Sequence, residues 1–114
     1  MKRPSMTDRT ERNDTMDFGD VIKEMKAHSS QRFAREAWYP RDACVFLTKG
    51  RTVRREDWVG SMPKGVKGDV RICSHIDMKT ADGRIVIGWS PSQIEMLADD
   101  WYKVVDDEGT DTDK

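Results

Sequence analysis

The sequence is poor in the residues that mark cross-links, metal centres and membrane spans. Its 114 residues include only two cysteines, Cys44 and Cys73, with no Cys-x-x-Cys pair and no Cys/His spacing typical of a zinc site. No apolar run approaches the roughly 20 residues that cross a bilayer, and the polar N-terminus lacks the apolar segment of a signal peptide. We therefore expect a cytoplasmic protein with reduced thiols, no bound metal and no membrane partner.

Recognisable catalytic motifs are also missing. His75 and Asp77 lie two residues apart and would form a general-base pair if they shared one face of a strand. A hydrolase would still need a nucleophile or a metal-bound water, and no serine or cysteine stands in a known context of that kind. The sequence therefore predicts no catalytic residue, no enzymatic activity and no cofactor.

Charges are abundant but nearly balanced. Charged and apolar residues each make up 36% of the chain, whose net charge is −1, so the core is lean and self-association would bury more apolar surface. Residues 49–84 are the most basic stretch, with nine Lys or Arg against five Asp or Glu. This balance suits phosphates on a small ligand better than duplex DNA, which calls for a clustered basic patch. A solvated loop of mixed charge explains it equally well.

Composition divides the chain into three parts. Residues 1–15 are almost devoid of apolar side chains, and residues 106–114 carry five acids against one lysine, so both ends are predicted to be disordered. Residues 16–105 have the patterning of one small domain. Within it, residues 49–69 contain four glycines and a proline, which predicts a long loop with one short strand near residues 52–54.

Two short helices are predicted from capping residues and periodicity. Asp17 suits an N-cap, and the apolar residues after it recur at i, i+3, i+4 and i+7, which predicts a helix to about Ala27. Ser90-Pro91-Ser92-Gln93 offers an N-cap serine, a proline at the first helical position and a Gln three residues on. This pattern predicts a second helix, capped by Ser90 and ending near Ala98.

Alternating and buried runs predict the strands. Asp82-Gly83 marks a tight hairpin turn, and the aromatic and proline cluster at residues 38–42 marks another turn. The order α-β-β-loop-β-β-α-β, without a βαβ rhythm, predicts an α+β domain built on a small antiparallel sheet with two short helices. The predicted strands are residues 31–35, 44–48, 70–79, 84–87 and 101–105.

One face of the predicted 70–79 strand is polar. Basic side chains counter phosphate charge, a carboxylate accepts hydrogen bonds from ribose hydroxyls, and a histidine can donate to either group. The solvent side of an antiparallel sheet would show the same alternation without any ligand. The residues of this face are Arg71, Cys73, His75, Asp77 and Lys79.

Large aromatic residues lie mostly at the ends of predicted elements. Purine bases stack on such rings, but the rings are also large core residues. Trp101 begins a strand and favours the core, whereas for Trp89, beside Gly88, ligand contact and core packing are equally compatible with the pattern. The helix start near Ser92 and Gln93 would favour an anion, although a capped helix end needs no ligand.

Several runs stand in order along residues 16–105: Met16-Asp17-Phe18-Gly19, Ala34-Arg35-Glu36-Ala37-Trp38, His75-Ile76-Asp77-Met78-Lys79-Thr80-Ala81-Asp82-Gly83, Trp89, Ser92-Gln93 and Ala98-Asp99-Asp100-Trp101. Together these runs resemble the Thoeris anti-defence proteins of the second type. The resemblance implies small α+β subunits that assemble into tetramers, with ligand pockets between subunits and no catalysis.

The resemblance also implies a function. Such phage proteins capture a cyclic ADP-ribose-type signal, such as a glycocyclic ADP-ribose, and in some members cyclic oligonucleotides, in the cytoplasm of the infected host. Binding leaves the signal intact and keeps it from the immune effector. On this basis we expect Phe18, Trp38 and Trp89 to frame the adenine and ribose, and Lys79 or Arg84 to face the pyrophosphate. Hydroxyls or base edges would bond to Asp77, Ser92 and Gln93.

An alternative function remains open. The basic segment 49–69 could bind an immune protein directly, in which case the protein would inhibit by partner contact and would ignore small molecules.

Overall fold

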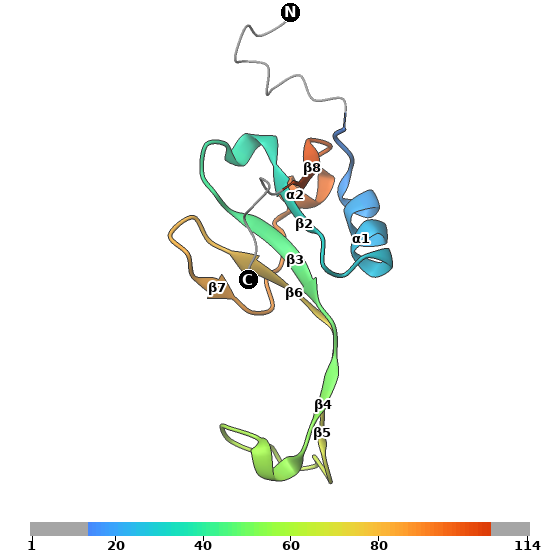
Figure 1. Cartoon of the computed structure of the whole chain (residues 1–114), viewed down its shortest axis with the longest axis vertical. Coiled ribbons are helices and arrows are strands. Elements are labelled where there is room, and N and C mark those ends of the chain that lie inside the picture. The colour runs from blue at the N-terminus through green and yellow to red at the C-terminus, as the bar shows by residue number, and fades with distance from the viewer. Residues whose placement is uncertain (1–13, 106–114) are drawn as a thin grey trace, which may run out of the picture.

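The computed structural model describes residues 14–105 (Figure 1). Most of the predicted N-terminal extension and all of the predicted tail 106–114 lie outside the described residues. Antiparallel strands form a five-stranded sheet in the order β7-β6-β3-β2-β8 and a separate two-stranded sheet of β4 and β5. The strands are β2 (Arg32–Arg35), β3 (Cys44–Thr48), β4 (Arg51–Val53), β5 (Val70–Ile72), β6 (His75–Lys79), β7 (Ile85–Val86) and β8 (Trp101–Val104); the helices are α1 (Phe18–Ala27) and α2 (Gln93–Leu97), with 3-10 turns η2 (Glu36–Trp38) and η3 (Arg55–Asp57).

The first helix forms as its sequence predicts. The Asp17 carboxylate accepts a hydrogen bond from the backbone N–H of Asp20 at 2.8 Å, which satisfies one of the unpaired donors at the helix start. Phe18, Val21 and Met25 are buried on one stripe of the helix. The α+β class and the two short helices are confirmed.

The core lies between one face of the sheet and α1. Phe33 of β2 and Val45 of β3 are direct partners in the sheet register and are fully buried. Since side chains alternate between faces, Leu47, Ile76 and Met78 lie on the same face as Val45, and all three pack against the core. We call this the helix face. The opposite face carries Phe46, Thr48, His75, Asp77 and Lys79.

A protruding arm, residues 49–74, interrupts the sheet between β3 and β6 (Figure 1). The predicted strand at residues 52–54 exists as β4, but the segment is not simply a loop, because β4 pairs with β5 into a two-stranded ribbon. The prediction of one continuous strand over residues 70–79 is wrong. Residues 70–72 pair with β4 in the arm, whereas residues 75–79 pair with β3 in the body.

Gly50 marks the point where the arm leaves the body. Its N–H donates to the Ser74 hydroxyl at 2.8 Å, so the two ends of the arm lie together. A Cβ at Gly50 would lie 2.4 Å from the Ile72 carbonyl oxygen and 2.9 Å from the Ser74 nitrogen. The close passage of two backbones therefore requires glycine here.

The second helix is capped by a different serine from the one predicted. Ser92, not Ser90, is the N-cap: its hydroxyl accepts from the Glu95 N–H at 3.2 Å, and the Glu95 carboxylate accepts from the Ser92 N–H at 2.7 Å. This is a complete capping box. Both serines fit the sequence pattern, and only Ser92 has the acidic partner three residues on.

Candidate functional site

Four aromatic rings meet on the helix face of the sheet. Trp101 is fully buried at their centre, with ring centroids 5.1 Å from Phe18 and 5.3 Å from Trp38. The Trp89 ring packs edge-on against the others at 6.4–6.5 Å. These spacings are typical of tilted and edge-to-face aromatic packing. The expected core position of Trp101 is confirmed, and Phe18 lies in the same core.

Trp38 and Trp89 border an open depression of about 270 Å³, which we call the tryptophan depression. Two of the predicted ligand rings are therefore brought together at the surface, although they are distant in sequence. Arg41 and Glu95 add one basic and one acidic group to the rim. The full lining is Trp38, Arg41, Ala43, Met78, Thr80, Ala81, Trp89 and Glu95.

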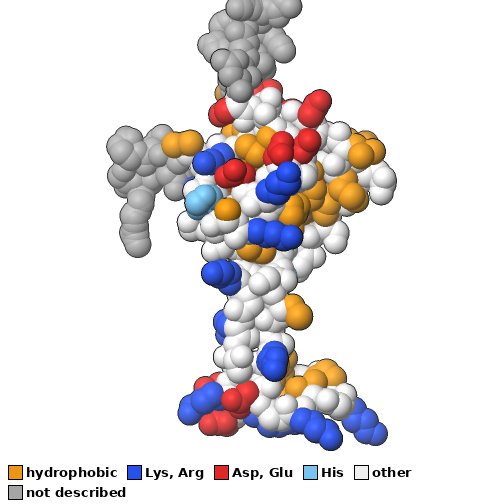
Figure 2. Space-filling view, turned by 90° about the vertical axis from the view of Figure 1, so that its right-hand side faces the viewer, with side chains coloured by type: hydrophobic (Ala, Val, Ile, Leu, Met, Phe, Trp, Pro, Cys, Tyr) orange, Lys and Arg blue, Asp and Glu red, His pale blue; other side chains and the backbone are white. Residues whose placement is uncertain are grey.

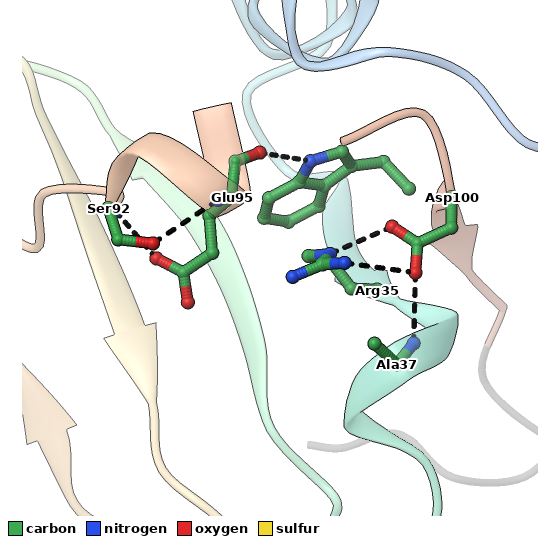
Figure 3. Close-up of polar contacts among 6 residues, drawn as sticks. Arg35, Ala37, Ser92, Glu95 and Asp100 are labelled. Atoms are coloured by element: carbon green, nitrogen blue, oxygen red, sulfur yellow. Dashed lines mark hydrogen bonds and ion pairs between the residues drawn. The ribbon is translucent and has the colours of Figure 1, made fainter. Parts of the chain in front are cut away.

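An ion pair sets the position of Trp38. The Asp100 carboxylate accepts two hydrogen bonds from the Arg35 guanidinium, at 2.8 and 3.3 Å, and a third from the Ala37 N–H at 3.0 Å (Figure 3). These contacts tie the ends of β2 and β8 to the turn η2, which ends at Trp38. The family resemblance included the segments that hold Arg35 and Asp100, but no role was predicted for either residue.

The middle of α2 is anchored to the aromatic cluster. The Trp101 indole N–H donates to the Glu95 carbonyl oxygen at 2.9 Å. The capping box uses the Ser92 hydroxyl and the Glu95 carboxylate within α2 (Figure 3). Gln93, the other residue predicted to bind ligand here, is exposed.

Asp77 is buried on the opposite face of the sheet, with 3% of its surface exposed. Its carboxylate accepts from the Thr48 hydroxyl at 2.6 Å, from His75 Nδ1 at 2.8 Å and from the Gly88 N–H at 3.0 Å. Burial by itself raises the pKa of Asp77, but the hydrogen bonds from Thr48, Gly88 and His75, with the electrostatic attraction of His75, lower the pKa below its ordinary 3.8. The carboxylate is therefore ionised at neutral pH and engaged within the protein.

The two predicted phosphate-facing residues do not line the tryptophan depression. Lys79 donates to the Asp42 carbonyl oxygen at 2.5 Å and pairs with the Asp42 carboxylate at 3.3 Å. Arg84 pairs with Asp82 at 3.3 Å across the hairpin turn and is largely exposed. The basic group that does border the depression is Arg41, which was not predicted because a lone arginine in a turn has no motif of its own.

A second and larger groove, of about 620 Å³, lies where the opposite face of the sheet meets the arm. We call it the arm groove. His75 borders both this groove and a third depression of about 440 Å³ beside α1. The lining of the arm groove is Phe46, Thr48, Arg51, Trp58, Ile72, His75, Asp77, Ile85 and Ile87.

Within residues 14–105, no cluster of three or more His, Cys, Asp or Glu side chains could hold a metal ion. In the same part of the chain, no helix has the length and apolar character needed to cross a membrane.

The fold and its surface define a small α+β domain with an aromatic-lined depression on one face. A family model described as the Thoeris anti-defense 2-like domain matches residues 16–104. The chain belongs to this family, which confirms the resemblance and supports a role in Thoeris anti-defence. No curated protein matches the chain.

Proposed function

We propose that this anti-defence protein binds and sequesters a cyclic nucleotide-derived immune messenger in the cytoplasm of the phage-infected host. The messenger would be a cyclic ADP-ribose isomer, such as a glycocyclic ADP-ribose, or a cyclic oligonucleotide. The observation that carries the proposal is the family match, which extends over the whole folded body. Capture would be stoichiometric and would leave the messenger intact.

The tryptophan depression supports this proposal as the place of binding. Indole rings at its border suit a purine, and Arg41 supplies a positive charge for the pyrophosphate. A dissociation constant of about 10 nM corresponds to a binding free energy of roughly −11 kcal/mol. For a ligand the size of cyclic ADP-ribose this is about 0.3 kcal/mol per heavy atom, an ordinary ligand efficiency.

The size of the depression supports a homo-oligomer. A volume of about 270 Å³ lies below the roughly 300–1,000 Å³ of most small-molecule pockets, so the tryptophan depression of one chain holds too little space by itself for a dinucleotide-sized ligand. On α2, next to Glu95, Ile94 and Leu97 are 74% and 81% exposed. A second copy packed on these side chains would close the depression and bury an apolar patch, in keeping with the expected tetramer.

Binding without turnover fits the environment of the one candidate general-base pair. His75 Nδ1 and the Asp77 carboxylate bond to each other, and Asp77 also holds Thr48 and Gly88. A carboxylate with three internal donors is suited to a structural role.

The test is capture and release. The full-length protein is incubated with cyclic ADP-ribose isomers and cyclic oligonucleotides, removed by filtration and then heat-denatured. We expect one messenger to leave the filtrate and return intact. Arg41→Gln should weaken capture at least tenfold, whereas Arg71→Gln, an equal loss of charge on the arm, should leave it unchanged. Cleaved messenger would make the protein an enzyme, and capture of none would reject sequestration.

The arm supports the alternative, a protein-binding inhibitor. The arm projects from the body and is narrow along its length, and its tip carries Lys, Arg, Asp and Glu side chains (Figure 2). If binding to a purified Thoeris protein persists without messenger and is lost on charge reversal at Arg54 and Arg55, both exposed on the arm, this alternative replaces sequestration.

A further inference from the structure

The arm groove combines polar and apolar side chains on the face of the sheet opposite the helix face. Its polar residues are Thr48, Arg51, His75 and Asp77, and the rest of its lining is aliphatic or aromatic. Ile85 and Ile87 are 52% and 73% exposed. A volume of about 620 Å³ lies in the usual range for a small-molecule site.

Asp77 fixes which nitrogen of His75 carries the proton. The ionised carboxylate can only accept, so His75 Nδ1 must donate the 2.8 Å hydrogen bond. The other ring nitrogen, Nε2, bonds to no other residue within 14–105. It is left to accept a hydrogen bond when the imidazole is neutral, or to donate one when it is protonated. Thr48 and Gly88 hold the carboxylate, so the ring is oriented in advance.

Arg51 brings a positive charge to the same groove. In the ribbon, Arg51 pairs with Ile72 and Thr52 pairs with Arg71, so Arg51 and Ile72 share one face while Arg71 lies on the other. Ile72 and Arg51 both line the groove, and no carboxylate in the described part of the chain pairs with Arg51. A guanidinium of this kind binds phosphate with two parallel hydrogen bonds.

Two aromatic side chains of the lining suit a flat ring. Phe46 comes from the sheet and Trp58 from the arm, so the two aromatic side chains reach the groove from different walls. The Trp58 indole N–H donates to the Ser61 carbonyl oxygen at 2.9 Å, which holds the indole within its own loop. Stacking on such a ring contributes about 1–3 kcal/mol per base in single-strand binders.

We propose that the arm groove is a second binding site, on the other face of the sheet from the tryptophan depression, for an aromatic monophosphate. Arg51 donates to the phosphate, and His75 donates to it from Nε2 when the ring is protonated or accepts from a phosphate that keeps one proton. Phe46 and Trp58 hold the ring system. Nucleoside monophosphates and simple aryl phosphates share this chemistry. The site is independent of the proposed messenger site, since the two are lined by different residues.

The test is a titration of the full-length, ¹⁵N-labelled protein with adenosine monophosphate, followed by NMR. We expect saturable shifts in the Trp58 indole and in the amides of Arg51 and His75, with the Trp38 and Trp89 indoles unmoved. Naphthyl phosphate should bind in the same place if the ring need only be flat, whereas adenosine and inorganic phosphate should each bind at least tenfold more weakly.

Matched variants locate the phosphate. Arg51→Gln should weaken binding of adenosine monophosphate about tenfold, whereas Arg71→Gln on the far face of the ribbon should change it less than twofold. His75→Gln should also weaken binding, with His28→Gln as its control, and the amide spectrum of each variant reports its folding. Equal effects of the two arginine variants, shifts confined to Trp38 and Trp89, or no shift at millimolar ligand would overturn the proposal. So would Trp58 shifts that follow protein concentration alone, because a second copy would then occupy the groove.

Discussion

The Asp77 carboxylate accepts a hydrogen bond from the Gly88 N–H at 3.0 Å, which ties the middle of β6 to the residue before Trp89. The Trp89 N–H in turn donates to the Ile76 carbonyl oxygen at 2.8 Å. Two consecutive backbone donors are thus held by neighbouring residues of one strand. The indole of Trp89 reaches the tryptophan depression because this connection fixes where the chain crosses β6.

Replacement of Asp77 by asparagine should destabilise the protein. The amide keeps the shape of the carboxylate but presents an NH₂ group toward donors, so at least one buried hydrogen bond is lost. We expect a loss of about 1–3 kcal/mol in the free energy of unfolding, measured with urea. Asp99→Asn, at an exposed carboxylate of the same charge, should lose less than about 0.5 kcal/mol. Equal losses would show that Asp77 contributes only its charge.

Asp77 should also make stability depend on pH in the acid range. Its pKa is lower in the folded protein than the ordinary 3.8, so the unfolded chain binds more protons and stability rises with pH across this interval. The contribution is complete above about pH 5 and is lost as the pH falls through the folded pKa. The stability difference between the wild type and Asp77→Asn should therefore shrink in unfolding curves recorded from pH 5 down to pH 2.5. A constant difference would contradict this linkage.

Gly50→Ala should disturb the junction of arm and body. The added Cβ would meet the Ile72 carbonyl oxygen at 2.4 Å, and a backbone carbonyl cannot move aside as a side chain does. We expect a loss of roughly 2–3 kcal/mol in thermal or urea unfolding, with amide shifts on both sides of the junction. Gly19→Ala, in the first turn of α1, places its Cβ 3.3 Å from the Asp17 Oδ1 that caps the helix, a much looser approach, and should change stability by less than about 1 kcal/mol in either direction.

Arg35→Lys should cost more than its conserved charge suggests. A lysine cannot make two parallel hydrogen bonds to Asp100, and the Arg35 side chain is only 13% exposed. We expect a loss of roughly 1–2 kcal/mol, together with a change in the intrinsic tryptophan fluorescence, because the turn η2, which ends at Trp38, loses one of its anchors. At the exposed Arg84–Asp82 pair, Arg84→Lys should have no measurable effect on either quantity.

Substitution of Ser90 and of Ser92 distinguishes the predicted N-cap of α2 from the observed one. Ser92→Ala removes the side-chain acceptor for the Glu95 N–H and should cost about 1 kcal/mol, with faster hydrogen exchange at the Glu95 amide. Ser90 lies before the N-cap, so Ser90→Ala should change neither the free energy of unfolding nor the exchange rate of the Glu95 amide. The reverse result would restore Ser90 as the N-cap.

Local patterns predicted the elements whose signals lie within a few residues. The stripe after Asp17 gave α1 to within one residue, and the apolar run at residues 44–48 gave β3 with its bounds. The prediction of one strand over residues 70–79 failed because polar and apolar residues go on alternating across the junction between arm and body. The pairing partner changes there from β4 to β3. That change depends on Gly50 and Ser74 meeting, which no local pattern records.

The expected site residues are only partly brought together. Trp38 and Trp89 border one depression, whereas Phe18, the third ring expected to contact ligand, packs in the core. Asp77 falls on the predicted polar face, but alternation could not reveal that Thr48 and Gly88, from other segments, would enclose it. Arg41 and Arg51 were missed as possible anion contacts because their significance comes from what tertiary folding places beside them.

The hydrogen bond between Gly50 and Ser74 closes the base of the arm, so the arm is a topological insertion between β3 and β6. The residue where the chain leaves the body, Gly50, is hydrogen-bonded to the residue where it returns, Ser74. On the body side of this junction, β3 and β6 pair directly with each other. This topology predicts that the segment between the two ends can be shortened, lengthened or exchanged while β3 stays paired with β6. Length variation in evolution would therefore concentrate in the arm, where it alters reach and leaves the body intact.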